Sequence, residues 1–328
     1  MKYIALPEDR VRRLTFYLAM EEYVARHINN DDDDLFFMWQ VSPTVIFGRN
    51  QVIEAEVNLD CCRSHGIQTY RRKSGGGCVY ADMSNIMFSY VTKSDSISLT
   101  FNRYIIMVVL VLRRLGVDAR ATGRNDVMIF DGDQGRKVSG NAFYHIPGHS
   151  IVHGTMLYDT CMEHMVGAIT PSDSKLVAKG VRSVRQHIAL LKDYITLSLD
   201  EFKVYVRENL CDGEIMLTDA DVEAIEDIEK EYLTDAFIYG NNPAYTVVKR
   251  KRIEGVGEME ARIEVKNGAV KAMNLVGDYF LVGEIDRLIG SLVGVKLTRE
   301  ALEAVLPERL DDIVSHLEKE DFIQLLLQ

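Results

Sequence analysis

The sequence contains few cysteines, and their arrangement fits neither a zinc site nor a paired redox motif. Among 328 residues there are five cysteines, with no C-x-x-C pair and no histidine at the spacing of a zinc site. Free thiols in a reducing compartment are the simplest account. The five are Cys61, Cys62, Cys78, Cys161 and Cys211.

Long hydrophobic runs are also absent, which argues against a membrane protein. The longest apolar stretch, YIIMVVLVL at residues 104–112, is half as long as a membrane-spanning helix and predicts a buried helix instead. The opening residues MKYIAL are too short for a signal peptide and are followed by charged residues. We therefore expect a cytoplasmic protein without a membrane segment.

Basic residues are outnumbered by acidic ones, which argues against a nucleic-acid partner. Lys and Arg number 38 against 49 Asp and Glu, giving a net charge of −11. Binding a duplex requires an extended basic surface that releases counterions. The acidic run at 219–231 predicts the solvated face of a helix.

The common phosphate-binding motifs are missing too, yet one glycine run points to an anionic ligand. Residues 71–85 read RRKSGGGCVYADMSN, without the Gly-Lys-Ser/Thr ending of a P-loop or the G-x-G-x-x-G of a dinucleotide fold. Three consecutive glycines let backbone N–H groups approach a phosphate or carboxylate, and three basic residues precede them. The alternative is a mobile hairpin tip. We favour a site for a nucleotide-like ligand.

The predicted elements indicate a mixed α/β (α+β) fold. The strands expected at 127–130 and 137–144 are joined by DGDQG and form a hairpin. We therefore expect a mixed, largely antiparallel sheet flanked by helices. Helices are also predicted at 10–28 and 55–65, and strands at 35–41, 44–48, 67–72, 78–81 and 86–92.

The last part of the chain predicts a second, smaller domain. Helices at 199–210 and 219–233 are followed by a break, NNP, at 241–243. Three strand candidates follow, YTVVKRKRI, EMEARIEVKNG and VKAMNLVG, with NG at 267–268 as a hairpin signal. Helices are predicted at 281–293 and 298–325. We therefore divide the chain into residues 1–242 and a small α+β C-terminal domain at 243–328.

Three later segments again place glycine and small polar residues beside short strands. They are GRND at 123–126, RKVSG at 136–140 and HGTML at 153–157. Together with RRKSGGGCV, in this order and with similar gaps, they make the chain resemble the lipoate-protein ligase family. LAMEE at 18–22, FGRNQ at 47–51 and KLVAKGVRSVR at 175–185 extend the resemblance over most of residues 10–190.

The resemblance implies a fold, a reaction and partners. The catalytic domain would share the fold of biotin protein ligases and would be followed by an accessory domain. Lipoate and ATP would form lipoyl-AMP and pyrophosphate, and the lipoyl group would pass to a lysine of a lipoyl domain of 2-oxoacid dehydrogenase E2 subunits or of the glycine cleavage H protein. Mg²⁺ would accompany ATP, with no tightly bound metal. Octanoate is the alternative acyl substrate.

The resemblance also assigns residues to this chemistry. Lys137 matches the catalytic lysine, whose ammonium would lie between the lipoate carboxylate and the α-phosphate and stabilise the charge between them. Asp126 would orient Mg²⁺ or a ribose hydroxyl, or merely cap a turn. The residues expected to bind ATP or lipoyl-adenylate are Arg72, Ser74, Gly75, Gly76, Gly77, Cys78, Val79, Tyr80, Asn125, Asp126, Lys137, Ser139, Gly140, His153, Gly154, Thr155, Lys179 and Arg182.

Several roles have two interpretations. For His153 we favour a pocket-lining role over that of a general base, because an amine attacking an activated acyl group needs little base strength. Arg71 is either a ligand contact or a structural ion-pair partner. The loop at 171–186 either closes over the adenylate or is an ordinary basic loop. Val79, Leu14 and Phe47 would line a tunnel for the aliphatic tail, or belong to the core.

Three other functions compete with the ligase. An acyl transferase would work without ATP through a cysteine nucleophile, Cys161 or Cys78, but the extended motif set makes most sense if an adenylate is held. A non-catalytic lipoate or nucleotide binder would be expected to lose Lys137 or a glycine. A biotin ligase would carry Gly-Arg-Gly-Arg-x-Gly where this chain has RRKSGGG.

Overall fold

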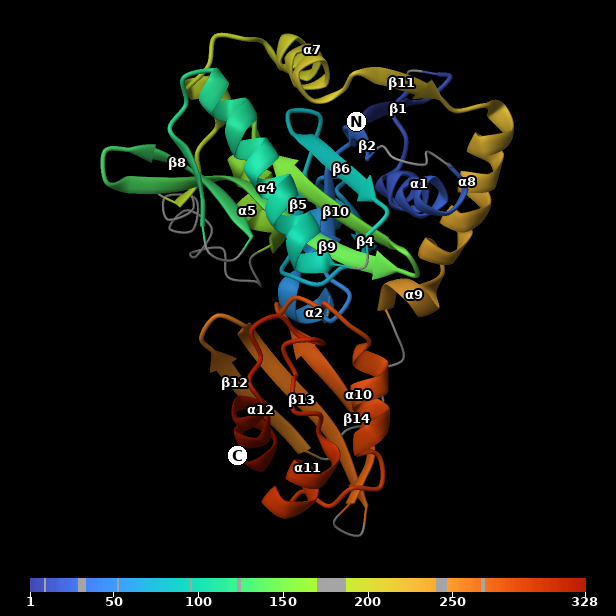
Figure 1. The fold of residues 1–328 in the computed structure, drawn as a ribbon, viewed down its shortest axis with the longest axis vertical. Helices are drawn as coiled ribbons and strands as arrows, with labels where there is room; N and C mark the ends of the chain where they lie inside the picture. The colour runs from blue at the N-terminus through green and yellow to red at the C-terminus, as the bar shows by residue number, and fades with distance from the viewer. Residues whose placement is uncertain are drawn as a thin grey trace.

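The chain forms a large α/β unit followed by a small C-terminal unit, as Figure 1 shows with the second unit in orange and red. The structure is a computed structural model that describes residues 1–328 except 9, 29–33, 52, 95, 123–124, 170–186, 240–246 and 267–268. The domain boundary predicted after residue 242 lies outside the described residues and stays a prediction. The loop at 171–186, with Lys179 and Arg182, also lies outside the described residues, so its predicted role stays a prediction.

An eight-stranded mixed sheet forms the centre of the large unit. The two pairs β11·β1 and β1·β2 are parallel, and the remaining neighbours are antiparallel. The expectation of a mixed, largely antiparallel sheet is therefore confirmed. The strand order is β11 (Gly213–Met216), β1 (Lys2–Ala5), β2 (Leu35–Trp39), β6 (Ile86–Thr92), β10 (His149–Met156), β9 (Gln134–Ile146), β8 (Asp126–Asp131), β7 (Ala119–Ala121).

Helices cover both faces of this sheet, so its strands bury side chains on both sides. Strand β2 illustrates this: Leu35, Phe37 and Trp39 pack with α1 (Leu14–His27) and α8 (Asp219–Tyr232), whereas Phe36 packs with α4 (Ile97–Arg114) and α7 (Leu199–Leu210). A continuous apolar run such as LFFMW is what a strand buried on two faces requires. The predicted buried helix at 104–112 is the middle of α4, although Ile106 and Leu110 of that helix are exposed. Within the described residues, no helix is long and apolar enough to cross a membrane.

A second, three-stranded sheet carries the glycine run. Its order is β4 (Gln68–Arg71), β3 (Thr44–Phe47), β5 (Val79–Ala81), with β3 parallel to β4 and antiparallel to β5. Residues 72–78 connect β4 to β5, and we call them the glycine loop. The short helices α2 (Ile53–Glu56) and α3 (Leu59–Ser64) replace the single helix predicted at 55–65. Further short elements are η1 (Leu191–Asp193), α5 (Met162–Ile169) and α9 (Asp235–Tyr239).

The C-terminal unit is an antiparallel sheet with helices and its own apolar core. The predicted helix at 298–325 is wrong: α11 ends at Val305 and a separate helix begins at Lys319. Pro307 explains the break, because proline disfavours helical backbone at the residue before it, and Leu306 is extended. The elements of this unit are β12 (Val247–Ile253), β13 (Gly257–Lys266), β14 (Ala269–Gly277), α10 (Ile285–Leu292), α11 (Arg299–Val305) and α12 (Lys319–Leu327).

Candidate active site

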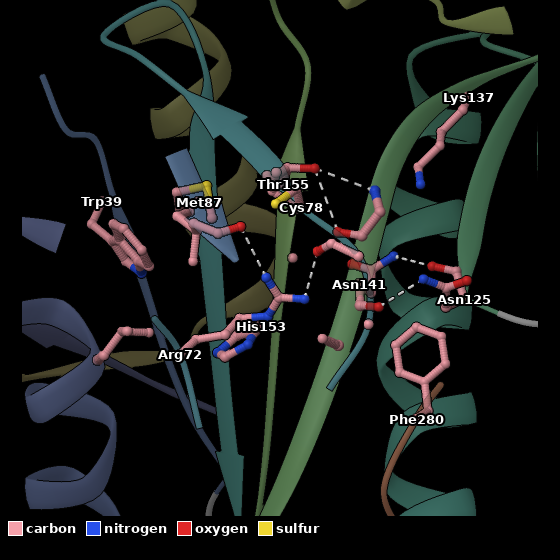
Figure 2. Close-up of a pocket in the computed structure, with 18 residues that line it drawn as sticks. Trp39, Arg72, Cys78, Met87, Asn125, Lys137, Asn141, His153, Thr155 and Phe280 are labelled. Carbon is pink, nitrogen blue, oxygen red and sulfur yellow. Dashed lines mark hydrogen bonds between the residues drawn. The ribbon is translucent and has the colours of Figure 1, made fainter. Parts of the chain in front are cut away.

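A cavity of ≈ 120 Å³ lies where the main sheet, the glycine loop and the C-terminal unit meet. Figure 2 shows Trp39 and Met87 on one side of it and Lys137 and Asn125 on the other. The predicted site residues that line it are Arg72, Gly76, Gly77, Cys78, Val79, Asn125, Lys137, Gly140, His153, Gly154 and Thr155. Lining residues that the sequence analysis did not assign are Leu18, Trp39, Ile46, Met87, Asn141, Ala142 and Phe280.

Other predicted residues lie behind the cavity wall. Ser74 and Ser139 are each 1% exposed and support the lining residues through hydrogen bonds. Tyr80 is buried in the core of the small sheet. Of the predicted tunnel residues, Leu14 and Phe47 are fully buried in apolar cores, whereas Val79 lines the cavity.

Arg72 organises the glycine loop. Its guanidinium is 5% exposed and donates to the Ser74 hydroxyl oxygen at 3.0 Å, to the Gly75 carbonyl at 2.6 Å and to the Gly77 carbonyl at 2.8 Å. Burial lowers the pKa of Arg72 to about 10, which leaves it charged near neutral pH. Arg71 has a similar structural role, because its guanidinium donates to the carbonyls of Arg49 at 2.7 Å and Gln51 at 2.8 Å.

Close backbone contacts explain why this loop is made of glycine. Gly76 has φ of +86° and donates its N–H to the Tyr279 carbonyl at 3.1 Å. A Cβ on Gly75 would lie 2.5 Å from that same carbonyl. At Gly77, by contrast, no atom of the described residues other than Gly77 and its two chain neighbours lies within 4 Å of where a Cβ would stand. The loop therefore presses against the C-terminal unit on one side and is open on the other.

A β-bulge places Lys137 in the cavity. Val127 pairs with Ser139 but Met128 pairs with Lys137, so Val138 is an extra residue on β9. Because directly paired residues point to the same face, the bulge turns Lys137 away from the face of Ser139 and onto that of Gly140. The Lys137 ammonium lies across Gly140, where a Cβ would be 2.8 Å from Nζ.

Asp126 is the counter-ion of this lysine. Its Oδ1 lies 2.8 Å from Lys137 Nζ, and the two side chains are 29% and 37% exposed. Among the described residues, no three His, Cys, Asp or Glu side chains gather as a metal would require. A Mg²⁺ ion commonly takes only one or two protein carboxylates and completes its shell with phosphates and water. Asp126 fits that minimal role as a single carboxylate.

Amide side chains fix the strands beside Lys137. Asn141 is 3% exposed and exchanges hydrogen bonds with Asn125: each side-chain amide donates to the backbone carbonyl of the other residue, at 2.9 and 3.0 Å. Ser139 donates to the Asn141 amide oxygen at 3.2 Å. Gly154 leaves room for this amide, since a Cβ there would be 1.8 Å from its oxygen. The GRND, RKVSG and HGT segments thus meet around the side chain of Asn141, the residue that follows RKVSG.

His153 lies in a buried hydrogen-bonded chain. Its Nε2 is 2.7 Å from the Ser74 hydroxyl, and its Nδ1 is 2.9 Å from Glu21 Oε2. The favoured pocket-lining role agrees with this burial, because His153 is 6% exposed and both ring nitrogens are engaged. Glu21 belongs to the LAMEE segment, which the sequence analysis noted without assigning a role to this residue.

The cysteines are poorly placed for a nucleophile. Cys78 lines the cavity, but burial raises the pKa of its thiol to about 12, so the thiolate is scarce near neutral pH. Cys161 is exposed at the start of α5 and does not line the cavity. Neither thiol combines reactivity with access to this cavity.

The cavity therefore has two chemically distinct ends. Trp39, Met87, Leu18 and Ile46 give it an apolar end. Lys137 lies on the opposite side and makes that end polar and cationic. Phe280 of the C-terminal unit closes part of the wall and stacks on Phe143 of β9 at 6.1 Å between ring centroids. The arrangement suits a ligand with an apolar chain and an anionic head.

Comparison with known proteins gives two matching family models. The model described as lipoyl protein ligase A/B catalytic domain matches residues 14–211, and the one described as bacterial lipoate protein ligase C-terminus matches residues 242–326. The lipoate-protein ligase LplJ of Bacillus subtilis is 33% identical over 321 residues, which cover 94% of this chain and 95% of the relative.

Solved structures of related ligases are also similar, and three of them are informative here. A bipartite lipoate protein ligase of Thermoplasma acidophilum, described with its E2 lipoyl domain, has a TM-score of 0.65 and 29% identity over 75% of this chain and 100% of its own. A putative lipoate protein ligase of T. acidophilum with bound lipoic acid has a TM-score of 0.62 and 26% identity, covering 74% and 100%. A lipoate-protein ligase A bound with ATP has a TM-score of 0.62 and 28% identity, covering 73% and 98%.

Proposed function

Because this chain belongs to the lipoate-protein ligase family and is an enzyme with lipoate-protein ligase activity, we propose that it works in two steps. In the first, a lipoate carboxylate oxygen attacks the α-phosphorus of ATP, the bond to the β-phosphate oxygen breaks, and pyrophosphate leaves. In the second, the ε-amine of a carrier lysine attacks the acyl carbon of lipoyl-AMP. An amide bond forms, AMP leaves, and the amine gives up a proton.

The single observation that carries this proposal is the position of Lys137 at the polar end of an otherwise largely apolar cavity. The first step brings a carboxylate up to a phosphate, and both are negative. The Lys137 ammonium, on the side of the cavity opposite Trp39 and Met87, is suited to lie between the carboxylate and the phosphate and to stabilise the charge of the transition state. One similar structure with lipoic acid and another with ATP support both co-substrates.

Asp126 keeps the ammonium in place before the substrates bind, through the contact at 2.8 Å. Once two anions flank Lys137, this carboxylate would be available to hold a Mg²⁺ ion that accompanies ATP. The ion would supply additional neutralisation of the phosphates. The remaining Mg²⁺ ligands would come from phosphate oxygens and water, because no three His, Cys, Asp or Glu side chains gather among the described residues.

The acceptor that we propose is a lipoyl domain of a 2-oxoacid dehydrogenase E2 subunit or the glycine cleavage H protein. The E2 lipoyl domain that accompanies one similar ligase supports the first of these. The C-terminal unit holds the Gly76 amide through the Tyr279 carbonyl and narrows the cavity with Phe280. It would have to release the glycine loop for phosphates to use that amide, and in this sense it gates the site.

The alternative, an ATP-independent acyl transferase with a cysteine nucleophile, is not favoured by the site. Its nucleophile should be a thiolate in the cavity, and Cys78 is a thiol near neutral pH while Cys161 lies outside the lining.

One assay tests the proposal: pyrophosphate release from ATP on addition of lipoate, with octanoate and biotin as comparisons. We expect release with lipoate and none with biotin. If lipoate does not stimulate release, ATP activation is refuted and the transferase becomes the better explanation.

A further inference from the structure

A chain of buried hydrogen bonds connects the apolar end of the cavity to the glycine loop. It runs through six side chains, each at most 6% exposed: Trp39, Ser89, Glu21, His153, Ser74 and Arg72. Burying a carboxylate is costly unless donors surround it. Glu21 is 0% exposed, yet it does not line the cavity. Its presence there needs an explanation.

The donors at the two ends of the chain favour one direction for its hydrogen bonds. An indole N–H and a guanidinium can only donate. Trp39 Nε1 therefore donates to Ser89 Oγ at 2.9 Å, which leaves the Ser89 hydroxyl hydrogen for Glu21 Oε1 at 2.5 Å. At the other end, Arg72 Nε donates to Ser74 Oγ at 3.0 Å, which leaves the Ser74 hydroxyl hydrogen for His153 Nε2 at 2.7 Å.

This direction also fixes the histidine. If Nε2 of His153 accepts from Ser74, the ring hydrogen must be on Nδ1, which faces Glu21 Oε2 at 2.9 Å and Oε1 at 3.1 Å. An N–H directed between two carboxylate oxygens is a good donor geometry. The side-chain hydrogen bonds that link the six residues then run toward Glu21 from both ends of the chain.

We propose that Glu21 is a positioning residue: it holds His153 in the Nδ1–H tautomer, and through Ser74 and Arg72 it fixes the glycine loop for ligand binding. Arg72 carries the effect to the loop, because its Nη2 binds the carbonyls of Gly75 and Gly77, on either side of the left-handed Gly76. The inference rests on the proposed activation of lipoate by ATP, since a fixed loop matters for holding the phosphates.

Glu21→Gln is the decisive variant, because an amide of the same shape can donate to Nδ1. It should invert the tautomer, as an amide in place of an orienting carboxylate does in a catalytic triad. Nε2–H and the Ser74 hydroxyl would then be two donors facing each other, so the hydroxyl would have to turn its hydrogen away, and the Arg72 contact would be disturbed. Glu229→Gln is the matched control, since Glu229 is also buried and accepts hydrogen bonds from Arg13 and Thr15, but lies away from the cavity.

Three measurements test the idea. Nitrogen-15 spectra of histidine-labelled protein, with the His153 signals assigned through His153→Gln, should show Nδ1–H in the wild type and in Glu229→Gln, and Nε2–H in Glu21→Gln. Hydrogen exchange at residues 72–78 should accelerate in Glu21→Gln alone. Lipoate-dependent pyrophosphate release should fall by roughly 10- to 100-fold in Glu21→Gln, about the loss seen when orienting partners of metal ligands are removed.

A double-mutant cycle separates positioning from mere support of the core. If Glu21 acts through Ser74, the variant with both Glu21→Gln and Ser74→Ala should be no slower than the slower single variant. Losses that multiply would overturn the proposal. So would an Nε2–H tautomer in the wild type, or an inverted tautomer in Glu21→Gln with unchanged loop exchange. A wild type without lipoate-dependent release would refute the ligase chemistry, whereas the spectra and loop exchange would still decide the role of Glu21.

Discussion

Replacing Lys137 tests the centre of the proposed chemistry. In Lys137→Ala the cavity loses the ammonium on the side opposite its apolar end. Removing one preorganised donor that stabilises developing charge typically lowers the rate by ~10²–10³, or about 2.7–4 kcal/mol. We expect a loss of that size in pyrophosphate release. Lys137→Arg should rescue little, because a planar guanidinium cannot replace a compact ammonium between two oxygens.

Stability should change far less than activity. The ion pair with Asp126 is partly exposed, and pairs of this kind contribute about 0–1 kcal/mol. A domain of this size can lose that much and stay folded. Thermal unfolding followed by circular dichroism should therefore show a shift of only a few degrees.

A second ion pair in the chain provides the control. Lys192 Nζ lies 2.8 Å from Asp159 Oδ2, with side chains 42% and 36% exposed, and neither residue lines the cavity. Lys192→Ala should match Lys137→Ala in stability and match the wild type in activity. The reasoning is refuted if Lys137→Ala releases pyrophosphate at the wild-type rate. It is also refuted if Lys137→Ala is unfolded, so that lipoate transfer from supplied lipoyl-AMP is lost to the same extent as formation of lipoyl-AMP.

Three further outcomes follow from the site. Gly140→Ala should lower pyrophosphate release by about tenfold or more, since the added Cβ would lie 2.8 Å from the Lys137 ammonium and displace it; an unchanged rate would contradict the position assigned to the ammonium. After treatment with iodoacetamide at pH 8, mass spectrometry should find Cys161 alkylated well before Cys78. Burial raises the pKa of Cys78 to about 12, so its thiolate forms only as the pH approaches that value. Cys161→Ala should retain activity, and equal alkylation rates in the folded protein would show that the cavity is open. A chain truncated after residue 242 should stay folded by near-ultraviolet circular dichroism, because the C-terminal unit has a separate apolar core, but should form adenylate more slowly without Phe280 on the cavity wall; a molten spectrum would show that the boundary is misplaced.

The strongly patterned elements could be predicted from the sequence. The apolar run of β2, the long helix α4 and the hairpin of β8 and β9 are each encoded by neighbouring residues. The glycine loop could also be recognised, because three adjacent glycines are rarely needed for an ordinary connection. The family could be identified from the order of four motifs along the chain. All of these are local signals, or sequences of local signals.

Short strands and helix ends were harder to predict. The four-residue strands β1 and β11 pair in parallel although they are more than 200 residues apart, and four residues give too little periodicity to recognise. The segment before α10 was predicted as helix, but Val282 and Gly283 donate their N–H groups to the Ile313 carbonyl instead. Tertiary hydrogen bonds outweighed a weak local preference there.

The sequence by itself determined which residue types supply the chemistry, and the tertiary structure decided where they point. RKVSG contains the lysine, but a bulge at Val138, set by pairing with β8, turns Lys137 toward the cavity. HGT contains the histidine, but Glu21, 132 residues away, engages its Nδ1. Phe280 reaches the cavity from the other unit without any sequence signal. Such contacts depend on register and packing between distant segments, which no local pattern of residues encodes.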